Sequence, residues 1–268
     1  MSRVTLEALL EQSWCSLSGM LFPMPPGGDI PVSPQTGHLP VSRLAHSKGI
    51  PSGFVQTDAR QWLERGAPDL LLISCYPHRL PEYVYANMSI PCLNLHPSLL
   101  PRYRGPDPLF WQFQRGETKT GFSWHQVTDT LDQGPVLQQG QVCFPTGCSQ
   151  QEAETRLITQ AVISLGECLA ESEYLKFSEQ NPEHSSYQSW PTAADWIVDS
   201  EWSAMRARNF VMAMSGRYDR FGVRSGSEFV TFREIGDWHA TGSIEQATIK
   251  QGTSTWCRFN PGYLELIE

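Results

Sequence analysis

Apolar residues along the chain recur with two different periods, which predicts helices alternating with strands. Helical spacing predicts helices at residues 5–12, 41–48, 58–65, 82–88, 108–115 and 150–170. Short apolar runs predict strands at residues 15–22, 51–55, 69–75, 92–96, 121–127 and 136–144. The run at 69–75 is almost continuously apolar, which is typical of a strand covered on both faces. We therefore expect an α/β fold with an open, mainly parallel sheet.

The pattern changes after the last of these helices. Residues 176–192 are rich in polar residues and proline, which predicts a linker. Residues 193–214 have helical spacing, and short β-rich pieces follow, such as 228–233 and 256–259. We therefore predict a large domain at residues 1–175, the linker at 176–192, and a small domain at 193–268 that combines a helix with β-structure.

Composition excludes several classes of protein. The 268 residues are 40% apolar and 18% charged, with a net charge of −8, which argues against a protein that coats nucleic acid or anionic membrane. No run approaches the roughly 18 apolar residues of a membrane span. Glu7 interrupts the position where a signal peptide has its apolar core. Seven cysteines without a Cys-x-x-Cys pair predict neither a zinc site nor a disulfide framework. We expect a cytoplasmic protein with no membrane partner.

Polar side chains gather where the strand at 92–96 ends. Asn94 and His96 point to the same side of this strand, because side chains alternate along it. Asp132 precedes a turn-forming Gln-Gly-Pro sequence on another loop. A carboxylate brought beside His96 is expected to favour its protonated form. An imidazolium and a carboxamide can hold an oxyanion, while Asp132 accepts a proton.

Each of these residues also has a structural explanation. Taken alone, His96 is better explained as a buried, hydrogen-bonded histidine and Asp132 as a turn residue. Ser98 can cap backbone groups, and Arg102 and Arg104 can form surface ion pairs. Only the combination of motifs favours a catalytic site.

That combination resembles the folate-dependent formyltransferase family, which includes glycinamide ribonucleotide transformylase, methionyl-tRNA formyltransferase and the sugar N-formyltransferases. The resemblance rests on Asn94-Leu-His96, Ser98-Leu-Leu-Pro101, Arg104-Gly105, Pro108 and Leu131-Asp132-Gln133-Gly134. It spans roughly residues 5–170 in the order of the predicted elements. It implies a Rossmann-like fold, 10-formyltetrahydrofolate as the donor, and an amine as the acceptor.

The resemblance also implies a role for each matched residue. Asn94 and His96 are expected to stabilise the oxyanion, and Asp132 to orient His96 and relay the amine proton. The pterin is expected between loops 74–80 and 127–132, with Tyr76, His78, Arg79, Leu80, Val127, Thr128, Asp129 and Leu131 as the folate-binding residues. Ser98, Arg104 and Gly105 are expected to shape the loop after the strand and to meet the substrate.

Two acceptors remain open. The tail resembles the C-terminal domain of methionyl-tRNA formyltransferase through Tyr187, Pro191 and Arg206-Ala-Arg208, which favours an aminoacyl-tRNA. Charge favours a small amine, such as a nucleotide-linked amino sugar, because residues 23–41 contain no Lys or Arg and residues 191–268 carry a net charge of −2. A homodimer is equally open.

Two sets of side chains bear on this choice. The five arginines between 206 and 224 are the one candidate phosphate-binding cluster, with solvated ion pairs as the alternative. The tryptophans either stack on a base or sugar or pack in the core, and packing is favoured for Trp196, Trp202, Trp238 and Trp256.

The family normally begins with an interior strand and a glycine-containing turn, whereas this chain begins at the helix that follows them. We therefore expect a gap in the sheet that leaves backbone groups unpaired. Three explanations are open: an earlier start of translation, a gap filled in another way, and a non-catalytic relative. A hydrolase that gives the formyl group to water is a further alternative, although the folate deformylases of this family carry an additional N-terminal domain.

Overall fold

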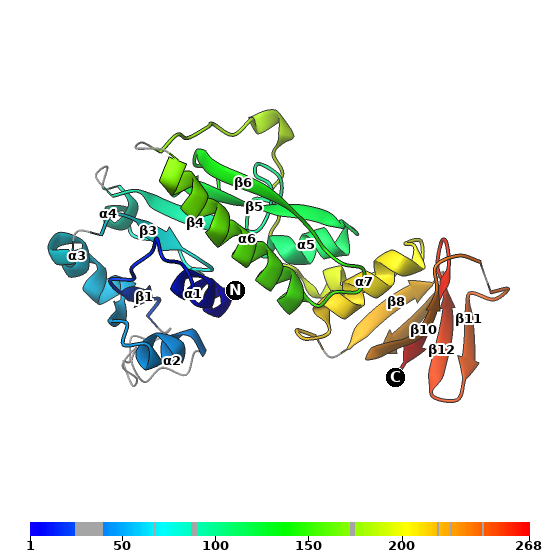
Figure 1. Ribbon diagram of the computed structural model, residues 1–268. Coiled ribbons are helices and arrows are strands. Elements are labelled where there is room, and N and C mark those ends of the chain that lie inside the picture. The colour runs from blue at the N-terminus through cyan, green and yellow to red at the C-terminus, as the bar shows by residue number, and fades with distance from the viewer. Residues whose placement is uncertain are drawn as a thin grey trace. The chain divides into compact units, whose positions relative to one another are not determined.

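The computed structural model describes residues 1–24, 40–66, 68–86, 90–171, 175–218, 220–225, 227–242 and 244–268. Most of residues 23–41, the stretch without Lys or Arg, lies outside this part of the chain. Contacts between residues divide the chain into two compact units (Figure 1). The first unit comprises residues 1–104, 121–142 and 154–185, and the second comprises 105–120, 143–153 and 186–268. This division by packing differs from the boundaries near 175 and 193, which stay a prediction about domains.

The first unit is an α/β structure whose strands form two sheets. Its strands are β1 (Met20–Phe22), β2 (Ser52–Phe54), β3 (Leu71–Ile73), β4 (Cys92–His96), β5 (Lys119–Gln126) and β6 (Val136–Cys143). Strands β1 and β2 pair in parallel, as do β3 and β4. The larger sheet has the order β3-β4-β5-β6, and β5 runs antiparallel to β4. The expected α/β fold with parallel pairing is confirmed, and the antiparallel pair makes the larger sheet mixed.

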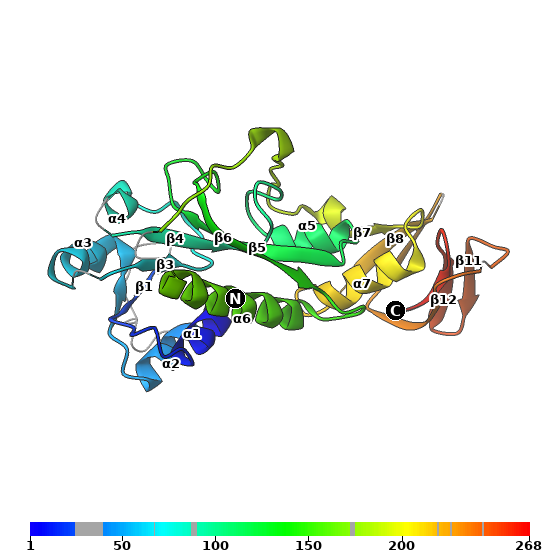
Figure 2. The ribbon, with the colours of Figure 1, turned by 45° about the horizontal axis from the view of Figure 1, so that its top comes forward.

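The helices of the first unit cover these sheets. They are α1 (Ser2–Leu10), α2 (Pro40–Ser47), α3 (Val55–Gly66), α4 (Glu82–Tyr85) and α6 (Gln150–Glu171), with a short 3-10 helix, η2, at Pro182–His184. Helix α6 lies against one face of the larger sheet (Figures 1 and 2), where Trp124 of β5 donates a hydrogen bond to Ala161 O at 2.8 Å. The buried positions Leu157, Ile158 and Leu165 form the helical apolar stripe that the sequence predicts.

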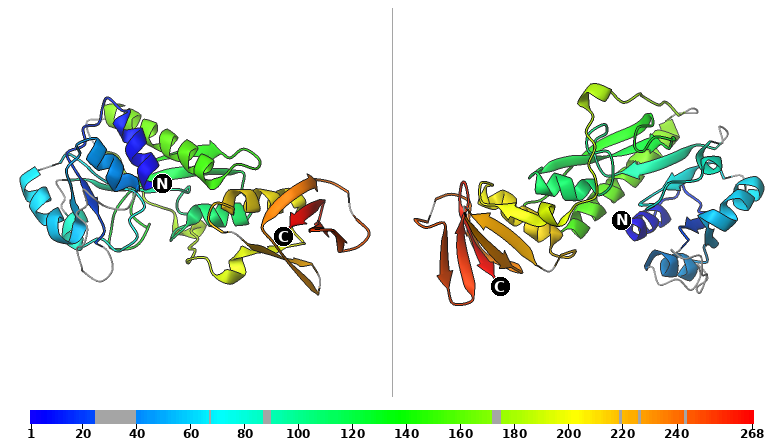
Figure 3. Two further views of the ribbon diagram at one scale, coloured as in Figure 1. Left: turned by 90° about the horizontal axis from the view of Figure 1, so that it is seen from below. Right: turned by 180° about the vertical axis from the view of Figure 1, so that it is seen from behind.

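Helix α1 packs with the smaller sheet and is tied to the end of β3. Leu6 belongs to a buried cluster with Phe22 and Phe54 of that sheet, and α1 lies beside α2 (Figure 3). Thr5 Oγ1 lies 2.8 Å from Ser74 Oγ, one residue after β3. Within the described residues, β3 is an edge strand of the larger sheet, and the sheet is interrupted between it and the β1–β2 pair. An interruption is what the sequence predicts.

The second unit joins two helices to two antiparallel-rich sheets. The first helix is α5 (Pro108–Gln114), and the remaining elements are η3 (Ala193–Trp196), β7 (Ile197–Asp199), α7 (Ala204–Met214), β8 (Phe221–Ser225), β9 (Glu228–Phe232), β10 (Glu234–His239), β11 (Thr248–Gln251), β12 (Ser254–Arg258) and β13 (Tyr263–Ile267). The sheet orders are β7-β8-β9 and β10-β13-β12-β11. Phe110 of α5 and Phe210 of α7 are both fully buried, with their ring centroids 5.5 Å apart. The expected β-rich C-terminal part is confirmed.

The single helix predicted at residues 193–214 is wrong in its first half. Thr192 and Asp195 form a capping box, but it begins only one 3-10 turn. The β-branched Ile197 and Val198 then pair in parallel with β8, an interaction that helical spacing alone does not reveal. A new helix starts after Ser203, whose hydroxyl accepts a hydrogen bond from Arg206 N.

Most other boundaries agree with the sequence. The strand at 92–96 is confirmed at both ends, and α6 extends one residue beyond the predicted helix. The strand expected at 15–22 is shorter, since only Met20–Phe22 pair with β2. The helix expected at 82–88 ends at Tyr85, and residues 87–89 lie outside the described part of the chain.

Replacing Trp124 with alanine tests how far the first unit depends on the packing of α6 against β5. Its side chain is fully buried, so we expect the free energy of unfolding to fall by about 3–5 kcal/mol. Ile163 belongs to the same helix, α6, but is 39% exposed, so Ile163→Ala is the control, with a loss below about 1 kcal/mol. Urea unfolding followed by far-UV circular dichroism measures both; equal losses contradict this account of the core.

Candidate active site

The site is built on the paired strands β4 and β5. Asn94 and His96 lie at alternate positions of β4, as predicted, with Asn94 half-buried and His96 4% exposed. The antiparallel register places Asn94 opposite His125 and His96 opposite Ser123. His125 is 2% exposed. Two buried imidazoles and a carboxamide therefore converge near the carboxyl end of β4.

Asp132 completes this group from the loop between β5 and β6. Its side chain is 7% exposed, and its backbone is left-handed, with φ at 54°. Asp132 Oδ2 lies 3.7 Å from His96 Nδ1, and Asp132 Oδ1 lies 3.6 Å from His125 Nε2. The structure thus brings together the three side chains that the resemblance matches, although no aspartate–histidine distance among them is as short as a direct hydrogen bond.

The environment of His96 fixes the position of its proton. His96 Nε2 lies 2.7 Å from Tyr103 O, and a carbonyl oxygen only accepts, so Nε2 carries hydrogen. In the neutral ring, Nδ1 is then a lone-pair acceptor that faces Asp132. Burial lowers the pKa of His96, while Asp132 and Tyr103 O oppose this and His125 adds to it. The expected effect of Asp132 is present but is outweighed by burial, so the resting ring of His96 is neutral.

His125 is a site residue that sequence reasoning missed. His125 Nδ1 lies 2.9 Å from Gln126 O, so Nδ1 is the donor and Nε2 the acceptor. Asn94 Nδ2 lies 3.1 Å from this Nε2 and donates to it. One amide hydrogen of Asn94 is thereby held by His125, which orients the carboxamide. The cross-strand register would have revealed His125, but pairing between distant segments is not visible in local periodicity.

Ser98 and Gly105 shape the loop that follows β4. Ser98 is fully buried, and its hydroxyl donates to Arg102 O at 2.6 Å. Its carbonyl accepts a 2.7 Å hydrogen bond from Ser123 Oγ. Gly105, the first residue of the second unit, has φ at 95°, and a side chain there would meet the carbonyl oxygen of Gln188. Both contacts fit the loop-shaping part of the prediction, and Ser98 has no exposed hydroxyl to offer a substrate.

Arg104 is buried beside Asp132 and is held by Gln180. Its Nε and Nη2 donate to Gln180 Oε1 at 3.1 and 2.8 Å. Burial lowers the pKa of Arg104, and the charge of Asp132 opposes that effect. Gln180 also donates to Asp132 O and Gly134 O at 2.9 and 2.8 Å. Gln180 is a second residue that sequence reasoning missed, because it lies in the segment predicted to be a linker.

The two loops expected to hold the pterin meet beside Asp132. Arg79 donates a hydrogen bond to Asp129 O, which joins loop 74–80 to loop 127–132. Tyr76 and Leu80 pack against the buried cluster formed by Val55, Ala59 and Val84, so their side chains contribute to the core.

The other side chains of these loops are more accessible. His78 and Arg79 are exposed, and Leu131 is 59% exposed immediately before buried Asp132. Val127 N donates a hydrogen bond to Cys92 O at 2.8 Å, and Thr128 Oγ1 donates one to Thr130 O at 3.1 Å. The exposed side chains of these two loops therefore include His78, Arg79, Asp129 and Leu131.

Of the five arginines between 206 and 224, Arg206, Arg208 and Arg217 contact other residues of the second unit. Arg220 and Arg224 are exposed. Arg206 donates to Gln114 O at 2.8 Å through Nε and lies 3.8 Å over the Trp202 ring. Arg217 forms a two-bond ion pair with Asp107, at 2.9 and 2.6 Å. These contacts favour the structural explanation of the candidate phosphate-binding cluster.

The four tryptophans also have partners within the second unit. The ring of Trp196 stacks on that of Tyr218, with 4.5 Å between the ring centroids. The guanidinium of Arg206 lies over the Trp202 ring, and that of Arg208 over the Trp238 ring. The ring centroids of Trp256 and Tyr263 are 5.6 Å apart. All four are half-buried and none is in the core, so packing in the core is not confirmed; their neighbours in the second unit are aromatic rings and arginines.

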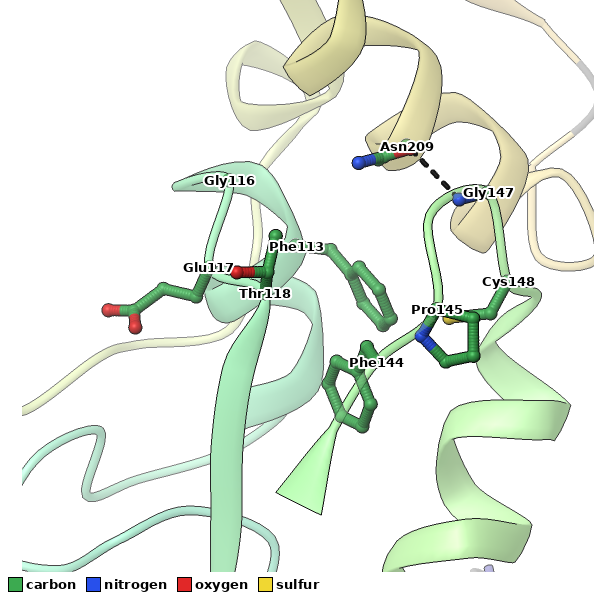
Figure 4. Close-up of a pocket in the computed structure, with 9 residues that line it drawn as sticks. All are labelled: Phe113, Gly116, Glu117, Thr118, Phe144, Pro145, Gly147, Cys148 and Asn209. Carbon is green, nitrogen blue, oxygen red and sulfur yellow. Dashed lines mark hydrogen bonds between the residues drawn. The ribbon is translucent and has the colours of Figure 1, made fainter. Parts of the chain in front are cut away.

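A hollow in the second unit lies outside this site. Figure 4 shows the stacked rings of Phe113 and Phe144 beside it, with Asn209 accepting a hydrogen bond from Gly147 N at 2.9 Å. Its volume is about 10 Å³, enough for one water molecule at most. Within the described ranges, no group of three or more His, Cys, Asp or Glu residues is placed to hold a metal ion, and no helix is long and apolar enough to cross a membrane.

Comparison with known proteins decides the family. Residues 33–169, just over half of the chain, match the model of the formyl transferase domain. The chain belongs to the formyl transferase family. It is 30% identical over 200 residues to the methionyl-tRNA formyltransferase of Thermotoga neapolitana, covering 72% of this chain and 64% of that protein. It is 29% identical over 165 residues to the GDP-perosamine N-formyltransferase of Brucella melitensis, covering 59% and 62%. The chain thus spans less than two thirds of the length of either relative.

A solved formyl transferase structure shares the fold. The N-formyltransferase from Helicobacter canadensis, solved with folinic acid and dTDP-3-aminofucose, superposes with a TM-score of 0.67. The match covers 98% of this chain and 94% of that chain at 12% identity. This likeness confirms the Rossmann-like architecture expected from the sequence.

The neutral state of His96 predicts how the stability of this protein depends on pH. The unfolded imidazole titrates near pH 6.5, and burial lowers the pKa of folded His96 below that value. Between the two pKa values the unfolded chain binds more protons, so the free energy of unfolding decreases as the pH falls below 6.5. As the pH falls from about 7 to about 5, we expect the free energy of unfolding to decrease less in His96→Gln than in the wild type.

Urea unfolding at both pH values measures this difference. His46→Gln is the control, because the His46 side chain is exposed on α2. Identical pH dependence in the wild type and His96→Gln contradicts a buried, neutral His96.

Proposed function

We propose that the chain transfers a formyl group from 10-formyltetrahydrofolate to a primary amine at the site of Asn94, His96 and Asp132. The observation that carries this proposal is the meeting of His96 Nδ1 with Asp132 Oδ2, 3.7 Å apart and both buried, in a chain of the formyl transferase family. The lone pair on Nδ1 can take up a proton, and the facing carboxylate of Asp132 stabilises the positive charge that the ring then carries.

The residues divide the chemistry of transfer between them. As the amine nitrogen bonds to the formyl carbon, Asn94 donates its remaining amide hydrogen to the formyl oxygen, which takes up the electron pair of the carbonyl bond. The proton that the amine nitrogen loses passes to the pair formed by His96 Nδ1 and Asp132. Protonated His96 then adds a positive charge next to the oxyanion. The carbonyl bond re-forms, the bond to the folate nitrogen breaks, and that nitrogen takes up a proton, which regenerates neutral His96.

The loops beside Asp132 fit a folate on one side of this group. We assign the pterin to the surface between loops 74–80 and 127–132, where Arg79 joins the loops and Leu131 is exposed. His78, Arg79, Thr128, Asp129 and Leu131 offer accessible groups there. Tyr76 and Leu80 contribute through their backbone, because their side chains pack against the cluster of Val55, Ala59 and Val84. Val127 contributes through its carbonyl group, because its N–H donates to Cys92 O.

For the acceptor, we favour a small phosphorylated amine such as a nucleotide-linked amino sugar. Binding a tRNA neutralises many phosphates with free Lys and Arg side chains. Arg206 and Arg217 instead contact Gln114 and Asp107, and residues 191–268 carry a net charge of −2. The similarity to methionyl-tRNA formyltransferase supports aminoacyl-tRNA as the second candidate. The cytoplasmic location and a homodimer stay predictions.

Replacing Asp132 tests the proposed chemistry. Asp132→Asn keeps the shape of the side chain but removes the proton acceptor, so we expect kcat to fall by about 10²- to 10⁴-fold with the fold unchanged. Asp69→Asn is the control, because Asp69 is exposed and lies two residues before β3. Release of tetrahydrofolate measures the rate; a kcat for Asp132→Asn near that of the wild type would falsify the assignment.

A competition between acceptors tests the substrate. We supply 10-formyltetrahydrofolate with a nucleotide-linked amino sugar, methionyl-tRNA or glycinamide ribonucleotide, and expect the amino sugar to give the highest kcat/KM. A higher value with methionyl-tRNA, decreasing steeply with salt, identifies the second candidate. No turnover with any of the three contradicts formyl transfer to these amines, and tetrahydrofolate release without an acceptor identifies a hydrolase.

A further inference from the structure

We propose that Gln180 is a positioning residue that holds the Asp132 loop so that the carboxylate faces His96. This inference rests on the proposed function of the same site. Gln180 does not touch the reacting groups; it acts through the backbone of Asp132 and through Arg104.

The amide hydrogens and the amide oxygen of the Gln180 side chain all form hydrogen bonds at this site. Its two amide hydrogens go to two different carbonyls of one loop, Asp132 O at 2.9 Å and Gly134 O at 2.8 Å. Its oxygen accepts two hydrogen bonds from Arg104. Four hydrogen bonds to one planar group fix its orientation, and only an amide of this length supplies both donors and an acceptor.

The Asp132 loop needs this support because of its backbone. A non-glycine residue in the left-handed region, as Asp132 is at φ 54°, is strained and persists only where its surroundings hold it. On one side, the loop is held against β5: Gln126 N donates to Pro135 O at 2.9 Å, and a side chain at Gly134 would meet Gln126 O. Gln180 supplies the second support, from another segment of the chain.

The segment that carries Gln180 is itself anchored. Ser178 and Val136 exchange two backbone hydrogen bonds, each of 2.8 Å, which attach this segment to the start of β6. Gln180 follows two residues later, at a fixed distance from the loop that precedes β6. The segment predicted to be a linker therefore contributes to the geometry of the site.

Gln180 carries no charge, and this affects the balance of charges around Asp132. Among the described residues, the titratable and charged groups that act on Asp132 include His96 from β4, His125 from β5 and Arg104 from the loop after β4. Because Gln180 is neutral, it binds the Arg104 guanidinium without forming an ion pair. The positive charge of Arg104 therefore still stabilises the Asp132 carboxylate. A carboxylate at position 180 would pair with Arg104 and oppose the ionisation of Asp132.

Two variants test the role of Gln180, with full-length wild-type protein as the reference. Gln180→Met keeps the length and removes all four hydrogen bonds; Gln180→Glu keeps the acceptor for Arg104 but cannot donate to the two carbonyls. We expect both to lower kcat by about 10- to 100-fold, because a shift of about 1 Å in a catalytic group is that costly. The KM values for folate and amine are expected to change less than about twofold, because Gln180 binds neither.

Asn181→Asp is the matched control. It adds the same charge one residue away and keeps the acceptor that caps Glu183 N at 3.0 Å, so wild-type kinetics are expected. Circular dichroism establishes that each variant is folded, and Gln180→Glu still tests the inference if Gln180→Met does not fold.

An NMR titration of the imidazole nitrogens gives a readout independent of turnover. If Gln180 positions Asp132, its loss weakens the contribution of the carboxylate, and His96 titrates at lower pH in Gln180→Met than in the wild type. An unchanged titration together with unchanged kcat overturns the inference; lower kcat with an unchanged titration also overturns it, because the role is then merely structural. A wild-type protein with no turnover refutes the proposed function, while the titration still decides whether Gln180 positions Asp132.

Discussion

The site depends on the antiparallel pairing of β4 with β5. This register places His125 opposite Asn94, so that one imidazole fixes the orientation of the carboxamide. The same pairing leaves Ser123 opposite His96, where its hydroxyl holds the carbonyl of Ser98 and thereby the loop that returns Tyr103 O to His96. A slip of one residue would turn every one of these side chains to the other face of the sheet.

Burial and charge act in opposite directions on His96, and their balance defines the proposed chemistry. A carboxylate beside an exposed histidine would leave it protonated, with no capacity to take up a proton. Here burial is the larger effect and keeps the ring neutral, so the pair of His96 and Asp132 stands ready to accept one. The buried Arg104 counterbalances the charge of Asp132 and helps the site to hold a carboxylate away from water.

The parts of the site that follow from local sequence were predictable. Alternation along residues 92–96 is enough to place Asn94 and His96 on one side, and the turn residues after Asp132 mark its loop. His125 and Gln180 were not predicted from the sequence, because each acts on a residue far away in the sequence. His125 does so through strand pairing, and Gln180 through a segment that looks like a linker. The helix expected at 193–214 failed for the same reason, since the pairing of β7 with β8 overrides local spacing. The charge state of His96 depends on burial, which motifs do not reveal.

The most direct measurement is a crystal structure of this protein with a 10-formyltetrahydrofolate analogue that cannot transfer its formyl group. The account predicts the formyl oxygen within hydrogen-bonding distance of Asn94 Nδ2, and the pterin between loops 74–80 and 127–132. It also predicts that the Asp132 carboxylate still faces His96. An analogue bound elsewhere, or a formyl group remote from Asn94 and His96, would contradict the central claim that these strand-end side chains carry out formyl transfer.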